Sequence, residues 1–196
     1  MIQKFDIPPG ATPLEPDELA GLRLTHITTK AELDRWEQDN INDALDWIPR
    51  RRGRDVLSET FLRALHKRMF GKVWTWAGQY RRSDKNIGVH WVRIAEEVKK
   101  LLDDVTYWSD HQTYSEDEIA ARFHHRLVWI HAFVNGNGRH ARLAADVLLK
   151  ETFQRPAFSW SGAEINVTSD IRRQYINALR DADRGEYGPL LNFVRM

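Results

Sequence analysis

The sequence predicts an all-α fold, and three observations favour it. Apolar side chains recur at helical spacing through most of the chain, as in residues 93–108 and 116–130. Residues that commonly cap helices precede several of these stretches. Residues 74–92 lose the helical period, so the exception is largely confined to one segment between predicted helices. At 196 residues, the chain is long enough to bury the core of one such domain.

The N-terminal part of the chain predicts an extended arm followed by a helix. Residues 1–16 contain four of the seven prolines, which favours extended backbone. Thr28 and Glu32 mark a helix start, because a hydroxyl cap is followed by an acid. The apolar period then continues to Pro49, and a basic loop follows at residues 50–54.

The remaining elements alternate between helices and one irregular segment. Ser58 predicts the cap of a helix that ends near Gly71. Residues 74–92 predict a short β-hairpin or an irregular flap, since they contain glycines and β-branched residues. The helices predicted beyond the flap cover residues 93–108, 116–130, 138–153 and 171–182, with a terminal segment through Leu190, Leu191 and Phe193. The predicted organisation is an N-terminal arm and helix at 1–54, hypothetically regulatory, and a catalytic core at 55–196.

Composition narrows the classes of protein. The 29 basic and 28 acidic residues give a net charge of +1, which does not favour a polyanion binder. The absence of cysteine excludes disulfides and thiolate metal sites. No apolar run of signal-peptide type or of membrane-spanning length occurs. We therefore expect a soluble cytoplasmic protein without a membrane partner.

Residues 131–142 combine several groups suited to phosphate chemistry. Gly136, Asn137 and Gly138 can adopt turns in which successive N–H groups point into one hollow. A helix that begins there would direct its unpaired N–H groups at the same point. Arg139 and Arg142 lie three residues apart, so both can lean over that end, and His131 supplies a titratable imidazole beside it. These groups suit the binding of a triphosphate next to a general base.

Each of these features also has a purely structural interpretation. The Gly-Asn-Gly stretch can be a simple turn between helices. Arg142 can form a surface ion pair with Asp146, four residues later. His131 can be a histidine stabilised by the negative end of a helix. The combination within twelve residues favours the functional interpretation over the three separate ones.

This segment resembles the signature of the Fic domain family, His-x-Phe-x-(Asp/Glu)-Gly-Asn-Gly-Arg-x-x-Arg. The matching residues are His131, Phe133, Gly136, Asn137, Gly138, Arg139 and Arg142. Similarity extends over roughly residues 55–195, including Trp74–Arg81, Phe123–Ile130 and Tyr175–Leu179. The whole chain is similar to the subgroup called mobile mystery protein B, which lies beside a helix-turn-helix partner in mobile elements.

The resemblance implies a helical bundle with a small β-hairpin flap and transfer of AMP from ATP to a protein hydroxyl. His131 would then be the general base for an attacking Ser, Thr or Tyr, and Phe133 would hold the loop from inside. Asn137 and the Gly136–Gly138 backbone would bind phosphates, and Arg139 and Arg142 would hold the outer phosphates and orient the α-phosphate. These groups act by positioning and by neutralising charge.

The same resemblance assigns the flap to target recognition. Lys85, Asn86, Ile87, Gly88 and Val89 would pair with an extended segment of the target protein by strand addition. The resemblance also makes an antitoxin-like or helix-turn-helix protein a candidate regulatory partner.

Two positions depart from the family pattern. Ala132 replaces a frequent proline, with a local effect on stiffness. Asn135 replaces the acid that helps to bind Mg²⁺. An amide oxygen can ligate a hard cation but brings no negative charge, so we expect weaker Mg²⁺ affinity at this position.

Two glutamates are candidates for inhibition. Family members often carry (Ser/Thr)-x-x-x-Glu-(Gly/Asn), whose glutamate pairs with the second motif arginine. Thr28 and Glu32 have the first spacing, but Leu33 occupies the last position. Glu37 lies on the same predicted helix without the hydroxyl residue four places earlier. Either glutamate could reach Arg142 if this helix packs near the site, or both could be solvated surface residues.

Other functions have weaker support. His124 and His131 lie two helical turns apart, about 10 Å along the helix, which does not suit a chelating pair of a metallohydrolase. The basic run 50–54 could touch nucleic acid, but an isolated basic loop is more typical of a solvated linker. Three hypotheses remain: a protein AMP transferase using ATP, a catalytically weak nucleotide-binding module, and an interaction protein working with a DNA-binding partner.

Overall fold

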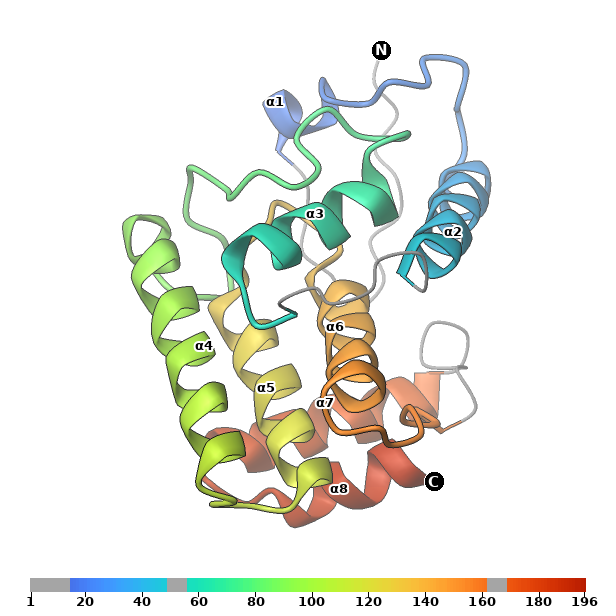
Figure 1. The fold of residues 1–196 in the computed structure, drawn as a ribbon. Helices are drawn as coiled ribbons and strands as arrows, with labels where there is room; N and C mark the ends of the chain where they lie inside the picture. The colour runs from blue at the N-terminus through green and yellow to red at the C-terminus, as the bar shows by residue number, and fades with distance from the viewer. Residues whose placement is uncertain (1–14, 49–55, 162–168) are drawn as a thin grey trace.

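The computed structural model describes residues 15–48, 56–161 and 169–196, and most of these residues are helical (Figure 1). The all-α prediction is therefore confirmed. The helices are α1 (Pro16–Leu19), α2 (Lys30–Trp47), α3 (Glu59–Phe70), the short 3₁₀ helix η2 (Trp91–Arg93), α4 (Ile94–Asp110), α5 (Glu116–Ile130), α6 (Asn137–Glu151), α7 (Ser169–Asp183) and α8 (Gly188–Arg195). Of the predicted arm at residues 1–16, residues 1–14 lie outside the described residues, as does the basic loop 50–54, and Pro16 begins helix α1 instead of continuing an extended arm.

Side-chain caps start the helices where the sequence predicts them. The Thr29 hydroxyl accepts a hydrogen bond from the Glu32 amide at 3.2 Å, and the Glu32 carboxylate accepts from the Thr29 amide at 3.0 Å. This reciprocal pair satisfies amides that the first turn of α2 leaves unpaired. Ser58 and Ser115 cap α3 and α5 in the simpler way, through their hydroxyls.

The helices pack in a bundle centred on α5 and α6 (Figure 1). Helix α4 packs against α5, while α3 packs against α6 and carries α2 on another side. Helices α7 and α8 pack together, and α8 also contacts α5. The fully buried side chains of the core include Leu65 on α3, Ile130 on α5 and Leu148 on α6. This packing holds the loop between α5 and α6 next to α3.

The flap takes the irregular form rather than the hairpin. Residues 79–90 contain no strand in this described stretch, and its pairing is limited to an isolated antiparallel bridge between Tyr80 and Phe133. The carbonyls of Ser83 and Val89 accept hydrogen bonds from the Arg81 guanidinium. These carbonyls are therefore engaged by a side chain instead of a partner strand, which explains why a hairpin ladder is missing here.

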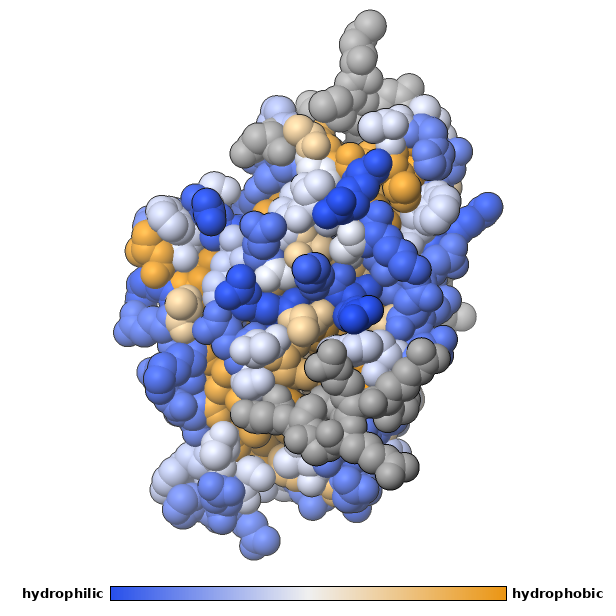
Figure 2. Space-filling view, turned by 45° about the horizontal axis from the view of Figure 1, so that its top comes forward, coloured by the Kyte–Doolittle hydropathy of each residue, from blue (hydrophilic) through white to orange (hydrophobic). Residues whose placement is uncertain are grey.

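The surface is mostly polar on the face drawn in Figure 2, where hydrophilic residues gather across the middle and hydrophobic ones form separate patches. Large apolar side chains that are at least two-fifths exposed include Ile87, Trp91 and Val92, all on or next to the flap. Among the helices of the described segments, none is both long and apolar enough to cross a bilayer.

Candidate functional site

Two residues with left-handed backbone frame the loop between α5 and α6. His131 ends α5 with φ 54° and ψ 55°, and Gly136 precedes α6 with φ 77°. The left-handed region is uncommon for a residue with a β-carbon, so His131 is held in a strained conformation by its surroundings. No side chain caps α6 at Gly136. The first amides of α6 thus keep their capacity to bind an anion.

Asn137 closes the loop from within. Its side-chain oxygen accepts from the Phe133 amide at 2.9 Å, and its side-chain nitrogen donates to the Phe133 carbonyl at 2.8 Å. Because both polar ends of this buried side chain are engaged, Asn137 holds the shape of the loop. The phosphate contact expected of its side chain stays a prediction; the backbone of the loop keeps that capacity.

A buried histidine supports the loop from α3. His66 Nδ1 accepts from the Gly78 amide at 3.0 Å, so Nε2 carries the proton and donates to the Asn135 carbonyl at 3.0 Å. Its ring stacks on Phe133 with 3.8 Å between the ring centroids. Burial lowers the pKa of His66 well below its usual value, and the nearby His140 lowers it further. A neutral imidazole of fixed tautomer thus holds the backbone at Asn135.

His131 lies under the flap and is largely buried. A Cβ built on Gly88 would come within 2.5 Å of the His131 Cβ, so only glycine permits this close approach. Burial lowers the pKa of His131 to about 4, and the positive charges of Arg81 and Lys85 act in the same direction against a backbone hydrogen bond at Val128. The imidazole is therefore neutral near pH 7, as a general base must be.

The first motif arginine is restrained by α2. Arg139 Nη1 lies 2.7 Å from Glu37 Oε2, and its guanidinium stacks over the Phe70 ring at 4.8 Å from the ring centroid. The other Glu37 oxygen accepts from Trp74 Nε1 at 2.6 Å. Glu37 is only 5% exposed, and each of its two carboxylate oxygens has a partner, as a buried charge requires. Of the two inhibitory candidates, Glu37 contacts the motif, through Arg139.

Glu32, the other inhibitory candidate, has a local role. Its carboxylate accepts hydrogen bonds from the amides of Thr28 and Thr29 at 3.0 Å each. These bonds lower the pKa of Glu32. Glu32 therefore completes the capping box of α2.

The second motif arginine contacts α7. Arg142 forms a side-chain hydrogen bond with Tyr175, and burial lowers the pKa of its guanidinium. The Tyr175 hydroxyl is also 2.9 Å from His124 Nε2. Asp146, the alternative ion-pair partner, accepts hydrogen bonds from Trp160 Nε1 and the Phe158 amide. The partly buried Arg142 is thus oriented by an aromatic hydroxyl.

The flap residues divide into buried and exposed ones. The Lys85 ammonium is buried in an ion pair with Glu18 of α1, which leaves the side chain 3% exposed. Asn86 and Gly88 are exposed, Val89 is partly buried, and Ile87 is 44% exposed. Of this set, Ile87 presents the largest apolar side chain to a partner.

The donor set at Asn135 does not fit a Mg²⁺ site of the usual carboxylate kind. Its side-chain oxygen accepts from the Gly136 amide at 2.6 Å. No group of three or more metal-ligating His, Cys, Asp or Glu residues occurs in the portion of the chain that the structure describes. A Mg²⁺ ion prefers at least one carboxylate besides phosphate oxygens, and the motif supplies none.

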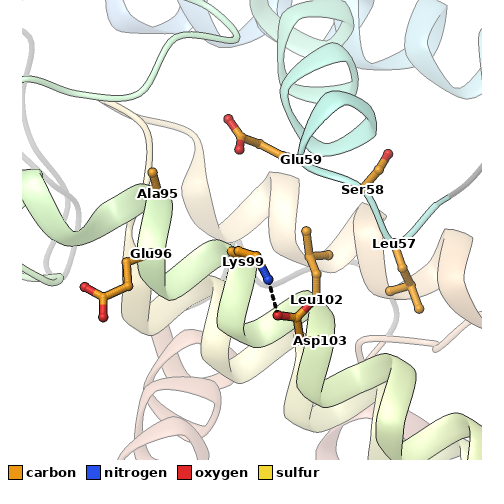
Figure 3. A pocket seen from close by; sticks show the side chains of 8 residues that line it. All are labelled: Leu57, Ser58, Glu59, Ala95, Glu96, Lys99, Leu102 and Asp103. Atoms are coloured by element: carbon orange, nitrogen blue, oxygen red, sulfur yellow. Dashed lines mark hydrogen bonds and ion pairs between the residues drawn. The ribbon is translucent and has the colours of Figure 1, made fainter.

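A surface cavity of about 540 Å³ lies away from the motif, between the start of α3 and the helix α4 (Figure 3). Its lining residues are Leu57, Ser58, Glu59, Ala95, Glu96, Lys99, Leu102 and Asp103. Lys99 and Asp103 pair with each other across one turn of α4. The cavity shares no residue with the motif and adds nothing to its chemistry.

Several residues of the site were given no catalytic or binding role from the sequence. They are His66, Phe70, Trp74, Arg81 and Tyr175. Most lie far along the chain from the residues they contact, so local spacing carries no signal for them. Their presence in the stretches similar to the Fic family was the available indication.

The chain is similar to known proteins of one family. A model of the Fic/DOC family matches residues 56–149. The chain is 26% identical over 192 residues to the protein adenylyltransferase Fic of Nematostella vectensis, covering 95% of this chain and 39% of that protein. The chain therefore spans well under half the length of this curated relative.

Solved structures share the fold. The N-terminal Fic domain of the Bep8 protein of Bartonella sp. 1-1C matches with a TM-score of 0.70 and 17% identity, over 90% of both chains. The BepC protein of Bartonella tribocorum, solved with bound AMPPNP, matches with a TM-score of 0.65 and 18% identity, over 87% of this chain and 88% of that one.

Proposed function

The chain belongs to the Fic/DOC family through residues 56–149, and on this premise we propose that it transfers AMP from ATP to a Ser, Thr or Tyr hydroxyl of a target protein. One observation carries the proposal: a single loop connects the neutral His131 to the N-terminus of α6. No side chain caps that N-terminus. Curated relatives named protein adenylyltransferases support the same chemistry.

In the proposed reaction, the hydroxyl oxygen of the target attacks the α-phosphorus of ATP. His131 takes the hydroxyl proton, and a new bond between the hydroxyl oxygen and the α-phosphorus makes a phosphodiester. The bond from the α-phosphorus to the oxygen that bridges to the β-phosphorus breaks, and pyrophosphate leaves. The amides of the loop and of the first turn of α6 would bind phosphate oxygens. Arg139, once free of Glu37, and Arg142 would bind the outer phosphates and balance the charge of the leaving group.

The test is a transfer assay with ATP labelled at the α-phosphate, together with Mg²⁺ or Mn²⁺ and a cell lysate. We expect label on protein with the wild-type chain and none with His131→Ala. ATP binding by the His131→Ala variant, measured by calorimetry, is the control that the pocket persists. Label that persists unchanged in His131→Ala would overturn the proposed role of this residue.

A second candidate function rests on Asn135. A loop that binds nucleotide without a carboxylate for the cation would act as a weak transferase or as a regulatory nucleotide-binding module. ATP binding without transfer would favour this candidate. A DNA-binding partner of the helix-turn-helix kind belongs to the same set of proposals, and a pull-down from cells tests it. A cytoplasmic location is likewise a proposal.

The Asn135→Asp variant distinguishes a limiting cation site from an adequate one. We expect transfer to rise about tenfold or more, because an added carboxylate contributes charge to a hard cation. The increase should be largest at low Mg²⁺ concentration. Equal rates for both proteins across a Mg²⁺ titration would show that the amide does not limit the reaction.

A further inference from the structure

Arg81 is a buried arginine at the start of the flap, and it is only 2% exposed. Its guanidinium donates to three backbone carbonyls: Nε to His131 at 2.7 Å, Nη1 to Ser83 at 2.8 Å and Nη2 to Val89. A buried guanidinium is costly unless its donors are satisfied. The segment from Ser83 to Val89 is therefore folded around this side chain, with both of its ends bound to it.

The backbone on each side of this segment is bound to the same stretch of chain. The Arg81 amide donates to the Ala132 carbonyl at 3.0 Å, and the Val89 amide donates to the Ile130 carbonyl at 3.3 Å. The His131 carbonyl lies between these two acceptors and takes the guanidinium Nε. Consequently the flap and the candidate base share one anchor.

We propose that Arg81 is a positioning residue, which sets the height of the flap over His131 and the orientation of that imidazole toward the target hydroxyl. This inference rests on the proposed transfer function. Its defining property is geometric: one planar fork joins the carbonyl of the candidate base to both ends of the target-facing segment. Arg81 itself has its donors engaged by protein carbonyls, so it would act on the reaction through His131 and the flap.

The phosphate loop has anchors of its own. Asn137 closes it onto Phe133, and His66 holds the Asn135 carbonyl. Loss of the Arg81 fork should therefore affect the step that uses the target more than the binding of ATP. That separation distinguishes a positioning residue from one that only stabilises the fold.

Arg81→Lys is the first variant, because it keeps the positive charge and loses the planar fork. We expect hydrogen exchange of the Val89 amide, which donates to the Ile130 carbonyl, to rise and transfer to the target to fall by about 10- to 100-fold, as for a misplaced reacting group. ATP affinity should stay within about twofold, since its binding groups are held separately. The adjacent Arg82→Lys, on an exposed side chain, is the matched control for exchange and ATP affinity.

Arg81→Ala with added methylguanidinium is the second variant, since the small cation fits the space left by the side chain. Restored protection of the Val89 amide, together with restored transfer, supports the proposal. Unchanged exchange of the Val89 amide in Arg81→Lys overturns it. Parallel losses of melting temperature, ATP binding and transfer also overturn it, because they indicate a general structural role.

The exchange measurement needs no turnover. If the wild-type chain transferred no nucleotide, the proposed function would fail, while protection of the Val89 amide and the NMR signal of the His131 ring would still report on the Arg81 contact. Removing the charge in Arg81→Ala should raise the pKa of His131, because the charge of Arg81 is the largest cause of its depression after burial. Arg81→Lys should leave that pKa low.

Discussion

The packing of the protein does not require a glycine at position 138. A Cβ at this position would meet nothing within 4 Å, although the residue lies in the first turn of α6. Packing therefore permits alanine, and an open space is left where a phosphate could approach the helix.

We expect Gly138→Ala to separate stability from binding. Alanine in a helix is favoured over glycine by about 0.5–1 kcal/mol, so the free energy of unfolding should stay equal or rise. ATP affinity should fall about tenfold or more, because the added methyl group occupies the space in front of the amides. Denaturant unfolding and calorimetry measure the two quantities on the same protein.

Gly136→Ala is the contrasting variant. Gly136 has φ 77°, and a Cβ there would come within 2.6 Å of the Phe70 ring. Both strain and the clash predict a clear loss of stability. If Gly138→Ala bound ATP as tightly as the wild-type chain, the open space would not be the phosphate position.

At the scale of helices, α2 restrains the motif through a single carboxylate. Glu37 connects α2 to Trp74 and to Arg139, on two other parts of the chain. We expect Glu37→Gln to raise ATP affinity and transfer by several-fold, because the neutral amide releases the guanidinium for phosphate while its oxygen can still accept from Trp74. Calorimetry and the α-phosphate transfer assay measure these effects.

Glu32→Gln is the matched control on the same helix. It weakens the cap of α2 slightly, because the amide oxygen still accepts from the Thr29 amide but the negative charge is lost, and it leaves ATP affinity unchanged. Higher affinity in both variants would assign the effect to loosening of α2 instead of release of Arg139. Lower affinity in Glu37→Gln would mean that the pair organises Arg139 for binding.

The sequence predicted helices well because their signals are local. The apolar spacing placed a helix at 116–130, where α5 is found, and a hydroxyl residue followed by Glu32 marked the start of α2, whose cap is Thr29. The Fic fold followed from the motif and its flanks. The flap was harder, since its form depends on a buried Arg81 that engages carbonyls up to 50 residues away.

The site was predicted in its parts but not in its supports. His131 and the two arginines lie at the loop, and their roles stay predictions. The backbone of His131 is left-handed, however, and residue type alone does not indicate that for a histidine. The contact between His66 and Asn135 spans 69 residues, so no local pattern could reveal it.

At the scale of the whole molecule, α2 belongs to the same hydrophobic core as the rest. Leu33 and Ala44 of α2 are buried in one cluster with residues of the remaining helices. The predicted division at residue 54 therefore separates segments that share packing in the described structure. Whether the N-terminal part regulates the core stays a prediction.

Buried neutral histidines predict acid sensitivity of the whole fold. Burial lowers the pKa of His131 and His140 to about 4 and that of His124 to about 3, against an ordinary value of 6.5. The unfolded chain binds these protons first, so the stability they contribute is complete above pH 6.5 and is lost as pH falls toward 4. A tenfold difference in proton affinity corresponds to about 1.4 kcal/mol.

The expected result is a steep fall in the free energy of unfolding between pH 6.5 and 4, measured by urea denaturation. Asp146 acts in the opposite direction, because burial raises its pKa to about 6, but it is one group against several. His140→Gln should flatten the fall if its amide keeps the hydrogen bond to the Leu62 carbonyl. A pH-independent unfolding free energy across this range would contradict the burial of neutral imidazoles.

The bond between Trp74 and Glu37 also has a consequence for how the molecule can be observed. The indole N–H of a buried Trp74 ends on the same carboxylate that holds Arg139, with its ring stacked on Trp76. When phosphate draws Arg139 away, the negative charge beside the indole is no longer compensated, and the emission of that ring should shift. Trp74 is thus an intrinsic fluorescent reporter of the contact between Glu37 and Arg139, and no added label is needed. The Trp74→Phe variant identifies the contribution of Trp74 to the total emission.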